Sequence, residues 1–261
     1  MKILVCVKQV IDPAATIQIG PHNGWPQEER TTEFCLNRFD EYAVEEALRI
    51  KQRWSSATVD IVSVGPRRVL AAVKRAQGMG ADHGIHIACE DQGHLSPFTI
   101  AGWIAALALR KAYDLILTGV MSEDAMQGQV GPTLAAMLDW PWATSVVSER
   151  ISDGQDRVRV ERETEGGRRD VLDLKLPAVL TIQSGINQPR YPKLSSMLKA
   201  NREGAETFAA PSLGAPDPRQ SVVRVAYPRK TRAGRILGGD CKEKARKLYG
   251  ILSQKGFIIR E

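Results

Sequence analysis

Cysteine is scarce in this chain and scattered along it. The four cysteines form no CxxC pair, which is the usual start of a zinc site or a redox motif. We therefore expect neither a disulfide framework nor a bound metal, and a protein that works in the reducing environment of the cytoplasm. The four are Cys6, Cys35, Cys89 and Cys241.

Long apolar runs and a secretory leader are also lacking. No stretch approaches the roughly 20 consecutive apolar residues that a membrane-spanning helix needs. The first residues, MKILVCVKQVID, have no extended hydrophobic core followed by a small-residue cleavage site. We expect a protein that is not embedded in a membrane and is not exported.

The common catalytic templates are missing as well. The sequence contains no GxxxxGK, HExxH or GxSxG motif. The nearest approach to a dinucleotide-binding GxGxxG motif, Gly78-Met79-Gly80, ends a helical pattern instead of following a strand. Three of the four histidines lie within residues 83–94 without a partnered serine or cysteine nucleophile. We predict no catalytic residues, and a protein that binds a ligand instead of breaking bonds.

Charge is distributed unevenly over the 261 residues, whose net charge is +6. From Ile186 to Glu261 there are 16 Lys and Arg against 6 Asp and Glu, so the preceding residues are slightly acidic. This pattern indicates a globular body followed by a basic arm, which either meets an anionic partner or is a solvated tail. We place the body at residues 1–202, and the linker and C-terminal arm at residues 203–261. Within the arm, composition indicates a linker over 203–220, a short strand over 221–227 and an amphipathic helix from about Asp240 to Gln254.

Short apolar runs alternate with segments of helical periodicity. The runs at residues 2–8, 58–64, 84–88, 114–119 and 176–183 are typical of strands that are buried on both faces. Helical spacing extends over 41–54, 67–79 and 96–112, and alternation around Glu165-Gly166-Gly167 indicates a β-hairpin. We predict an α/β fold with a mostly parallel, doubly wound, Rossmann-like sheet of the adenine-nucleotide-binding kind, extended by this hairpin.

Capping residues mark the starts of two of these helices. Ser96 followed by Pro97 fits an N-cap and a first helical position. Either Asn37 or Asp40 is expected to cap the helix that precedes Trp54.

Residues 114–133 contain the clearest candidate for a ligand site. A strand ends at Gly119, a polar loop follows, and Gly128 to Gly131 open a helix with Pro132 in its first turn. Free N–H groups at such a helix start favour a phosphate, and Ser122 and Gln129 can add hydrogen bonds. The alternative is an ordinary strand–helix loop that needs glycine only for its geometry.

A series of motifs runs in order through residues 1–200. It comprises Val7-Lys8-Gln9-Val10-x-Asp12, Asn37-x-Phe39-Asp40-x-x-Ala43-Val44-Glu45-Glu46-Ala47, Met79-Gly80-Ala81-Asp82, Gly131 with Asp139-Trp140-Pro141, Val160-Glu161-Arg162-Glu163, Leu174-Lys175-Leu176-Pro177, and Asn187-x-Pro189-Arg190-Tyr191-x-x-Leu194 with Lys199-Ala200. Together these motifs closely resemble the β (small) subunit of the electron-transfer flavoproteins. The last 60 residues match that family only in layout.

The resemblance implies a role, partners and cofactors. The family is a heterodimer that carries electrons from primary dehydrogenases, such as the acyl-CoA dehydrogenases of fatty acid β-oxidation, to a quinone oxidoreductase. It thus implies an obligate α-subunit partner, a C-terminal arm that packs on that subunit, and an electron-carrier subunit instead of a stand-alone enzyme. The redox FAD is expected mainly in the α subunit, with Phe39 contributing to one wall of its site.

The resemblance also implies an adenine nucleotide bound to this chain. AMP is preferred; the alternative is a second FAD, as in the electron-bifurcating members, in a chain with its own NADH site. Gln129-Val130-Gly131-Pro132 looks like the bifurcating group, whereas Ala125, Met126 and Gln127 replace the acidic and threonine residues expected just before it. The implied cofactor-binding residues are Cys6, Asn37, Arg38, Phe39, Asp40, Val64, Glu123, Asp124, Ala125, Met126, Gln127, Gly128, Gln129, Val130, Gly131 and Thr133.

A partner-docking loop is the last implied feature. It maps to Arg190, Tyr191, Leu194, Met197 and Lys199, with Leu194 as the apolar anchor. Two positions are open for Leu194: it begins an amphipathic helix and packs into the core of this chain, or it points outward while Met197 and Leu198 seat the helix.

Two other functions would account for parts of the sequence. A universal-stress-type nucleotide-binding or hydrolysing protein would account for the first 150 residues but not for the pattern at 187–200. A nucleic-acid partner would use the basic residues Arg229, Lys230, Arg232 and Arg235, but few aromatics and no known binding motif accompany them. We expect no nucleic-acid partner.

Overall fold

A computed structural model of the chain describes residues 1–19, 32–90, 95–214, 216–227, 234 and 236–258. The chain forms two units, Met1–Val225 and Ala226–Glu261. The cluster of basic residues at 229–235 noted in the sequence lies outside the described residues.

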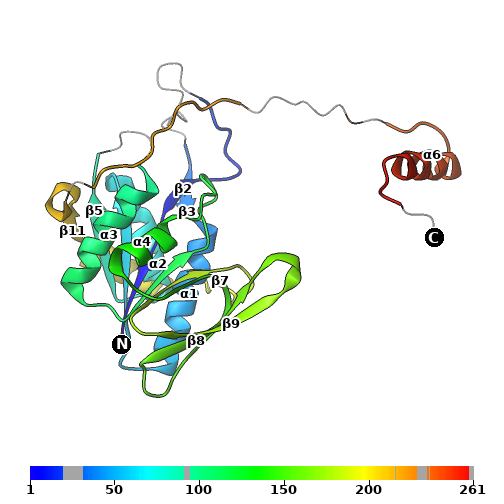
Figure 1. The fold of residues 1–261 in the computed structure, drawn as a ribbon. Helices are drawn as coiled ribbons and strands as arrows, with labels where there is room; N and C mark the ends of the chain where they lie inside the picture. The colour runs from blue at the N-terminus through cyan, green and yellow to red at the C-terminus, as the bar shows by residue number, and fades with distance from the viewer. Residues whose placement is uncertain (20–31, 91–94, 215, 228–233, 235, 259–261) are drawn as a thin grey trace. The chain divides into compact units, whose positions relative to one another are not determined.

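A nine-stranded sheet forms the centre of the first unit (Figure 1). Its strand order is β11-β5-β4-β1-β6-β10-β7-β8-β9, and every pairing from β11 to β7 is parallel. The last two pairings, β7 with β8 and β8 with β9, are antiparallel and form the hairpin extension. The strands are β1 (Lys2–Cys6), β4 (Thr58–Gly65), β5 (His83–Ala88), β6 (Leu115–Gly119), β7 (Trp142–Ile151), β8 (Arg157–Glu163), β9 (Arg169–Lys175), β10 (Ala178–Ile182) and β11 (Glu206–Ala209).

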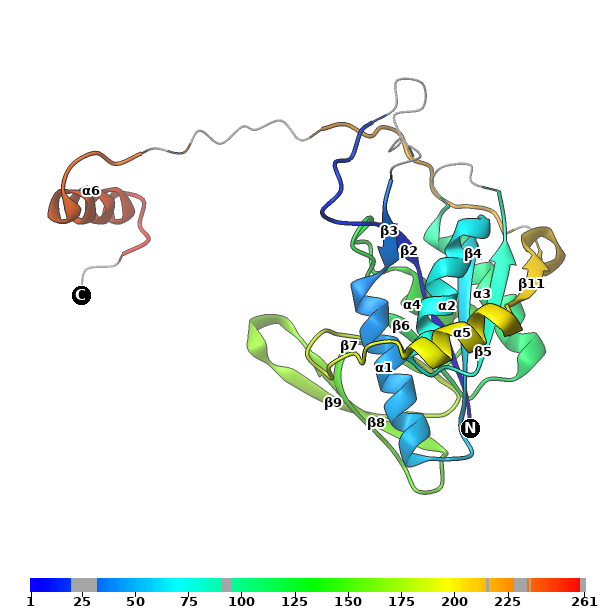
Figure 2. The same cartoon turned by 180° about the vertical axis from the view of Figure 1, so that it is seen from behind.

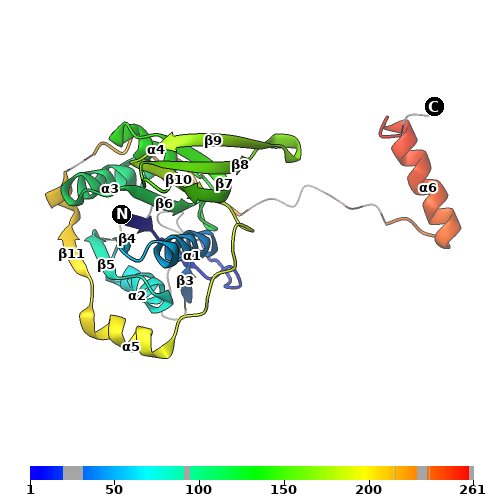
Figure 3. The same ribbon diagram turned by 90° about the horizontal axis from the view of Figure 1, so that it is seen from below.

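Helices cover both faces of the parallel part of this sheet, as Figures 2 and 3 show. One face packs against α1 (Arg38–Arg53) and α2 (Leu70–Met79), and the other against α3 (Pro97–Lys111) and α4 (Val130–Leu138). Successive residues of β1 alternate between the two layers: Ile3 and Val5 belong to the α1–α2 layer, and Leu4 belongs to the α3–α4 layer. The mostly parallel, doubly wound fold expected from the sequence is therefore confirmed.

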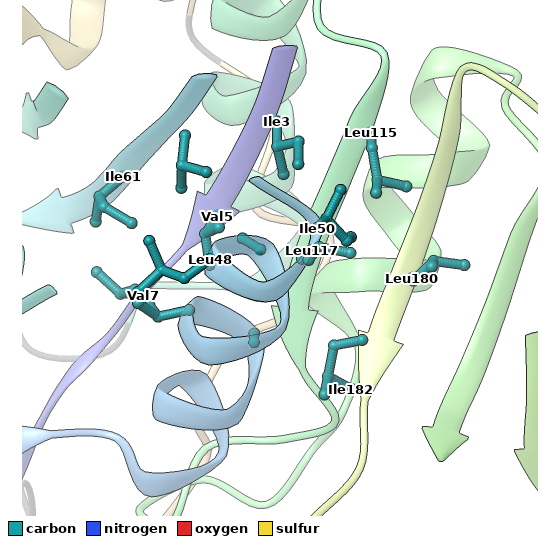
Figure 4. Packing of buried hydrophobic residues seen from close by; sticks show 14 of the residues in the cluster. Ile3, Val5, Val7, Leu48, Ile50, Ile61, Leu115, Leu117, Leu180 and Ile182 are labelled. Carbon is teal, nitrogen blue, oxygen red and sulfur yellow. The ribbon is translucent and has the colours of Figure 1, made fainter. Parts of the chain in front are cut away.

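The core is made of aliphatic side chains that are almost completely excluded from solvent. In the layer drawn in Figure 4, Ile3, Val5, Ile61, Leu115 and Leu117 have no exposed surface. Burying each such side chain stabilises the fold by about 1.5–3 kcal/mol before conformational entropy is counted. The apolar runs recognised in the sequence are thus the strands that hold both helix layers together.

Smaller elements complete the first unit. The strands β2 (Gln9–Ile11) and β3 (Phe34–Leu36) form a separate antiparallel pair, and α5 (Leu194–Glu203) packs on the outer side of α2. Short 3-10 helices are η1 (Arg67–Val69), η2 (Glu165–Gly167), which lies in the hairpin turn, and η3 (Ala210–Leu213).

Local signals in the sequence agree with the helix starts. Ser96 accepts a hydrogen bond from the N–H of Thr99 at 3.1 Å, and Pro97 is the first residue of α3, as predicted. In the second unit, α6 (Cys241–Gln254) begins after Asp240, which accepts from the N–H of Glu243 at 2.8 Å. The predicted C-terminal helix is thereby confirmed.

Two predictions about the segment after residue 202 were wrong. Residues 206–209 are not part of a linker, because they form β11, which adds a parallel strand beside β5, and η3 follows directly. The apolar alternation at 221–227 forms no strand among the described residues, and it pairs with no strand of either sheet. None of the described helices is both long and apolar enough to cross a membrane.

Candidate functional site

The candidate site lies where the chain reverses its direction of travel across the sheet. Strands β4 and β5 lie on one side of β1, and β6 lies on the other, so the loops after β1 and β6 lead to opposite faces. Ligands of open α/β sheets bind at this switch point, beyond the carboxyl ends of the strands. The first residues of α1 lie at the same edge, because Asp40 contacts both loops.

Asp40 joins the ends of the two central strands. Its carboxylate accepts hydrogen bonds from the N–H of Lys8, just after β1, at 2.7 Å and from the N–H of Gly119, the last residue of β6, at 3.1 Å. Burial raises the pKa of Asp40 to about 7, although the hydrogen bonds from Lys8, Asn37 and Gly119 act in the opposite direction. Asp40 therefore bridges the two strand ends and gains or loses its proton near neutral pH.

Cys6 ends β1 beside this carboxylate. Burial, followed by the nearby charge of Asp40, raises the pKa of the Cys6 thiol far above its ordinary value. The thiol therefore remains protonated at neutral pH and contributes a small apolar surface to the site.

Asn37 ties the start of α1 to the loop after β6. Its side-chain N–H donates to the carbonyl of Met121 at 2.9 Å, and its oxygen accepts from the N–H of Glu123 at 3.1 Å. Asn37 is the N-cap residue of α1, one of the two that the sequence predicted, but its side chain makes no capping hydrogen bond. The Glu123 carboxylate instead accepts from the N–H of Arg38, the first residue of the helix, at 3.3 Å.

Lys8 closes the other side of the same loop. Its ammonium group donates to the Asp124 carboxylate at 2.7 Å and to the Ser122 hydroxyl at 3.3 Å. Partial burial acts to raise the pKa of Asp124, but the charge and hydrogen bond of Lys8 lower it. Lys8 was not among the predicted site residues. It follows a buried strand and belongs to the Val7-Lys8-Gln9 motif, and these two features could have identified it.

Two glycines permit close packing at the site. A β-carbon at Gly119 would lie 2.7 Å from the carbonyl carbon of Phe39, so β6 and α1 approach each other only because this side chain is missing. A β-carbon at Gly131 would collide with Thr181 and lie 3.1 Å from the Thr118 hydroxyl. Gly131 is thus required for packing α4 on the sheet, whatever that helix start binds.

The remaining predicted cofactor residues gather around this edge with different exposure. Phe39, Val64, Gly128, Val130 and Thr133 are half-buried, and the tip of the loop is exposed. A hollow of about 610 Å³ lies beside them, and Arg38 and Glu123 belong to its lining, together with Pro13, Cys35 and Arg75. This volume lies in the range of small-molecule sites. The exposed loop residues are Asp124, Ala125, Met126, Gln127 and Gln129.

The predicted docking residues are located elsewhere, on α5 and the stretch before it. Leu194 is 76% exposed and Tyr191 is 87% exposed, so neither belongs to the core of this chain. Met197 packs over Gly78 of α2, whereas Leu198 is 51% exposed. The expectation that Met197 and Leu198 both seat the helix holds only for Met197.

The two charged residues of this group are engaged within the chain. Arg190 forms an ion pair with Glu45 of α1, with Nε and Oε2 2.8 Å apart, and Lys199 lies 3.6 Å from Glu203. Arg190 thus fixes the beginning of the stretch that leads into α5, a role that no sequence motif indicated.

Comparison with known proteins agrees with the fold and the motif order. The family model described as the electron transfer flavoprotein domain matches residues 27–213. The chain is 37% identical over 243 residues to the electron transfer flavoprotein subunit beta of Sus scrofa, covering 90% of this chain and 91% of that protein. It is 33% identical over 265 residues to the subunit beta of Methylophilus methylotrophus, covering 97% and 98%. The chain therefore belongs to the electron transfer flavoprotein family, among its β subunits.

Proposed function

We propose that this chain is the small subunit of a heterodimer that accepts electrons from primary dehydrogenases, such as acyl-CoA dehydrogenases, and passes them to a quinone oxidoreductase. Membership of the family and similarity to its β subunits over nearly the whole chain support this role. The partner is the α subunit, which holds most of the redox-active FAD. When bound, that FAD supplies the electron-accepting and electron-donating chemistry.

The contribution of this chain to the FAD site is shape. Phe39 is half-buried in the first turn of α1 and is held in place by the contact between its backbone and Gly119. We propose that its ring forms one wall of the FAD site and excludes water there.

We further propose that the edge at Asp40 holds a structural adenine nucleotide, AMP in preference to a second FAD. The donors suited to its phosphate are the Lys8 ammonium and the N–H groups at the start of α4. Asn37 and Asp40 organise the loop around it through the hydrogen bonds described above. Ala125, Met126 and Gln127 offer no additional charged groups to a larger cofactor.

The exposure of Leu194 is the observation that carries the docking part of the proposal. Leu194 lies with the exposed side chains of Tyr191 and Leu198 on a segment that is otherwise anchored, and a group of exposed apolar side chains suits an interface hot spot. The flanking Lys193 and Lys199 would then lie at its polar rim. We propose that Leu194 enters an apolar pocket on the dehydrogenase.

The cofactor assignment is tested by co-expressing the chain with its α subunit and purifying the complex. The released nucleotides are identified by mass spectrometry, and the flavin is counted from the visible spectrum. One FAD and one AMP per heterodimer is the expected result. Two FAD per heterodimer, one of them reducible by NADH, would replace AMP with the bifurcating alternative. A chain that binds no α subunit but hydrolyses ATP would instead favour the universal-stress type of function.

The docking assignment is tested by Leu194→Ala, with Leu109→Ala as a matched control. Leu109 is 68% exposed on α3, so the two changes remove similar surface from different faces. Burial of a leucine on a partner contributes about 1.5–3 kcal/mol, so Leu194→Ala is expected to raise the half-saturating dehydrogenase concentration about tenfold or more. Leu109→Ala should leave it unchanged, and equal effects of the two variants would contradict the docking role.

A further inference from the structure

Two sequence motifs that lie about 140 residues apart are in direct contact. The pair Glu45-Glu46 belongs to the middle of α1, and the Asn187-x-x-Arg190 motif precedes α5. Arg190 donates to Glu45 through Nε at 2.8 Å, through Nη2 at 2.9 Å and through its backbone N–H at 3.1 Å. The Asn187 side chain donates to Glu46 at 2.7 Å. We refer to these four residues as the α1 clamp.

The Arg190–Glu45 contact is a bidentate ion pair, which is among the stronger hydrogen-bonded contacts in proteins. Two guanidinium N–H groups meet the two oxygens of one carboxylate, which fixes orientation as well as distance. Glu45 is only 5% exposed, so its charge has few alternatives to Arg190 for compensation. The hydrogen bonds that the Arg190 guanidinium donates to the Glu45 carboxylate raise the pKa of Arg190 above its ordinary value.

The remaining contacts of the clamp lie on the same face of α1. Asn187 also donates to the backbone carbonyl of Tyr42 at 3.0 Å, and Arg49 donates to the carbonyl of Ile186 at 3.3 Å. Residues 42, 45, 46 and 49 are spaced at three, four and seven positions, which places them along one side of a helix. That side of α1 therefore receives the chain from residue 186 to residue 190.

A second anchor lies on α2. The N–H of Lys193 donates to the carbonyl of Gly78 at 3.2 Å, and Met197 fills the space that a side chain at position 78 would need. A β-carbon at Gly78 would also lie 3.2 Å from Pro192. The residues between the two anchors include Tyr191, and Leu194 follows Lys193 directly, so the two most exposed apolar side chains of this region are bracketed by the anchors.

We propose that the α1 clamp and the Gly78 contact position the segment 190–199 for docking, so that Glu45, Glu46, Asn187 and Arg190 are positioning residues for partner recognition. The inference rests on the proposed docking function of Leu194. Anchoring holds the segment in one conformation before the partner arrives, which lowers the entropy that must be lost on binding. Arg190 and Glu45 bond each other within the chain, and the Asn187 NH2 group bonds to Tyr42 and Glu46, so these groups serve to hold the segment. The side-chain oxygen of Asn187 is buried without a hydrogen-bond partner among the described residues.

The test uses the heterodimer with Arg190→Ala, Arg190→Lys and Glu45→Gln, and Arg202→Ala as a control. Arg202 is an exposed arginine of α5 outside both anchors. The first readout is amide hydrogen exchange of Lys193 and Met197, whose N–H groups are hydrogen-bonded. Loss of the clamp should speed their exchange about tenfold, with the amides in the middle of α1 unchanged. Lysine at position 190 keeps the charge but not the paired geometry, so its effect should be intermediate.

The second readout is electron transfer from a purified acyl-CoA dehydrogenase reduced by its acyl-CoA substrate. Arg190→Ala and Glu45→Gln should raise the half-saturating dehydrogenase concentration about tenfold, with the maximal rate, flavin content and nucleotide content unchanged. Arg202→Ala should change neither exchange nor transfer. Gly78→Ala provides an independent variant if Arg190→Ala does not fold, because it removes the second anchor instead.

Three outcomes separate the inference from the function on which it rests. In the first outcome, Leu194→Ala weakens electron transfer, whereas the clamp variants exchange their amides faster but transfer electrons normally. This outcome refutes the positioning role and leaves the docking role of Leu194 standing. If exchange of the segment does not change, the clamp does not hold it and the inference fails. If neither Leu194→Ala nor the clamp variants affect transfer while exchange rises, the docking role itself is refuted.

Discussion

The buried carboxylate of Asp40 predicts a specific dependence of stability on pH. Its pKa is about 7 in the folded protein, compared with 3.8 for an ordinary aspartate. The folded state thus binds more protons than the unfolded state between these values, and the stability from this group is fully present below about pH 4. It is lost as the pH rises through 7. At about 1.4 kcal/mol per pKa unit, the loss is on the order of 4 kcal/mol, and it is an intrinsic cost of keeping the carboxylate buried.

The substitution Asp40→Asn removes this titration while preserving the shape of the side chain. The amide oxygen can accept from the N–H of either Lys8 or Gly119, and its NH2 group then faces the other N–H. One unmade hydrogen bond costs about 1–3 kcal/mol, so the variant should be less stable than the original protein at pH 5. Between about pH 4 and pH 7 only the original protein loses the Asp40 contribution, so the difference should close or change sign as the pH approaches 7 and stay level above it.

The measurement is urea unfolding of both heterodimers at fixed protein concentration, in steps from pH 5 to pH 8.5. Every other titrating group is shared by the two proteins, so the difference in unfolding free energy isolates Asp40. A difference that stays constant over this range would refute the reasoning, because it would mean that Asp40 ionises with an ordinary pKa. The same constant difference would follow if the hydrogen bonds from Lys8 and Gly119 outweighed burial, because a pKa lowered below 3.8 lies outside this pH range.

Three further predictions follow from single contacts. Gly119→Ala should lower the unfolding free energy by about 1–3 kcal/mol and reduce nucleotide content, because a β-carbon there meets the backbone of Phe39; unchanged content by mass spectrometry would contradict this. Burial and the charge of Glu46 raise the pKa of Glu149 above its ordinary value, so Glu149→Gln should reduce the loss of unfolding free energy as the pH rises toward 7. Parallel pH profiles of the two proteins in urea unfolding would contradict this. Ser96→Ala should cost about 1 kcal/mol in thermal unfolding through the lost cap of α3, and Ser96→Asn should restore most of it.

The strands and helices of the body could be predicted because their signals are local. A continuous apolar run such as residues 115–117 is buried wherever a parallel sheet places it, and Ser96-Pro97 begins a helix through contacts within one turn. The alternation of these elements then restricts the fold to a doubly wound sheet. The start of α4 after Gln129 and the hairpin around Gly166 follow from the same kind of local pattern.

The strand β11 could not be predicted in this way. Residues 206–209 have little apolar character, and their extended conformation depends on the free edge of β5, which lies about 120 residues earlier. The run at 221–227 shows the converse: its alternation resembles a strand, but in the described chain it pairs with no strand. Strand formation depends on a partner, whereas helix formation is satisfied within the segment.

The sequence alone determined the family, the layered α/β body and the residues to examine, because these depend on local periodicity and on the order of motifs. Only the tertiary structure decided what those residues do to one another. It gave the side chain of the N-cap residue Asn37 to the loop after β6, placed Lys8 against Asp124, and joined Arg190 to Glu45. Contacts between charged and polar side chains distant in sequence leave no periodic pattern, since each is specified by the geometry of two backbones instead of by the residues beside it.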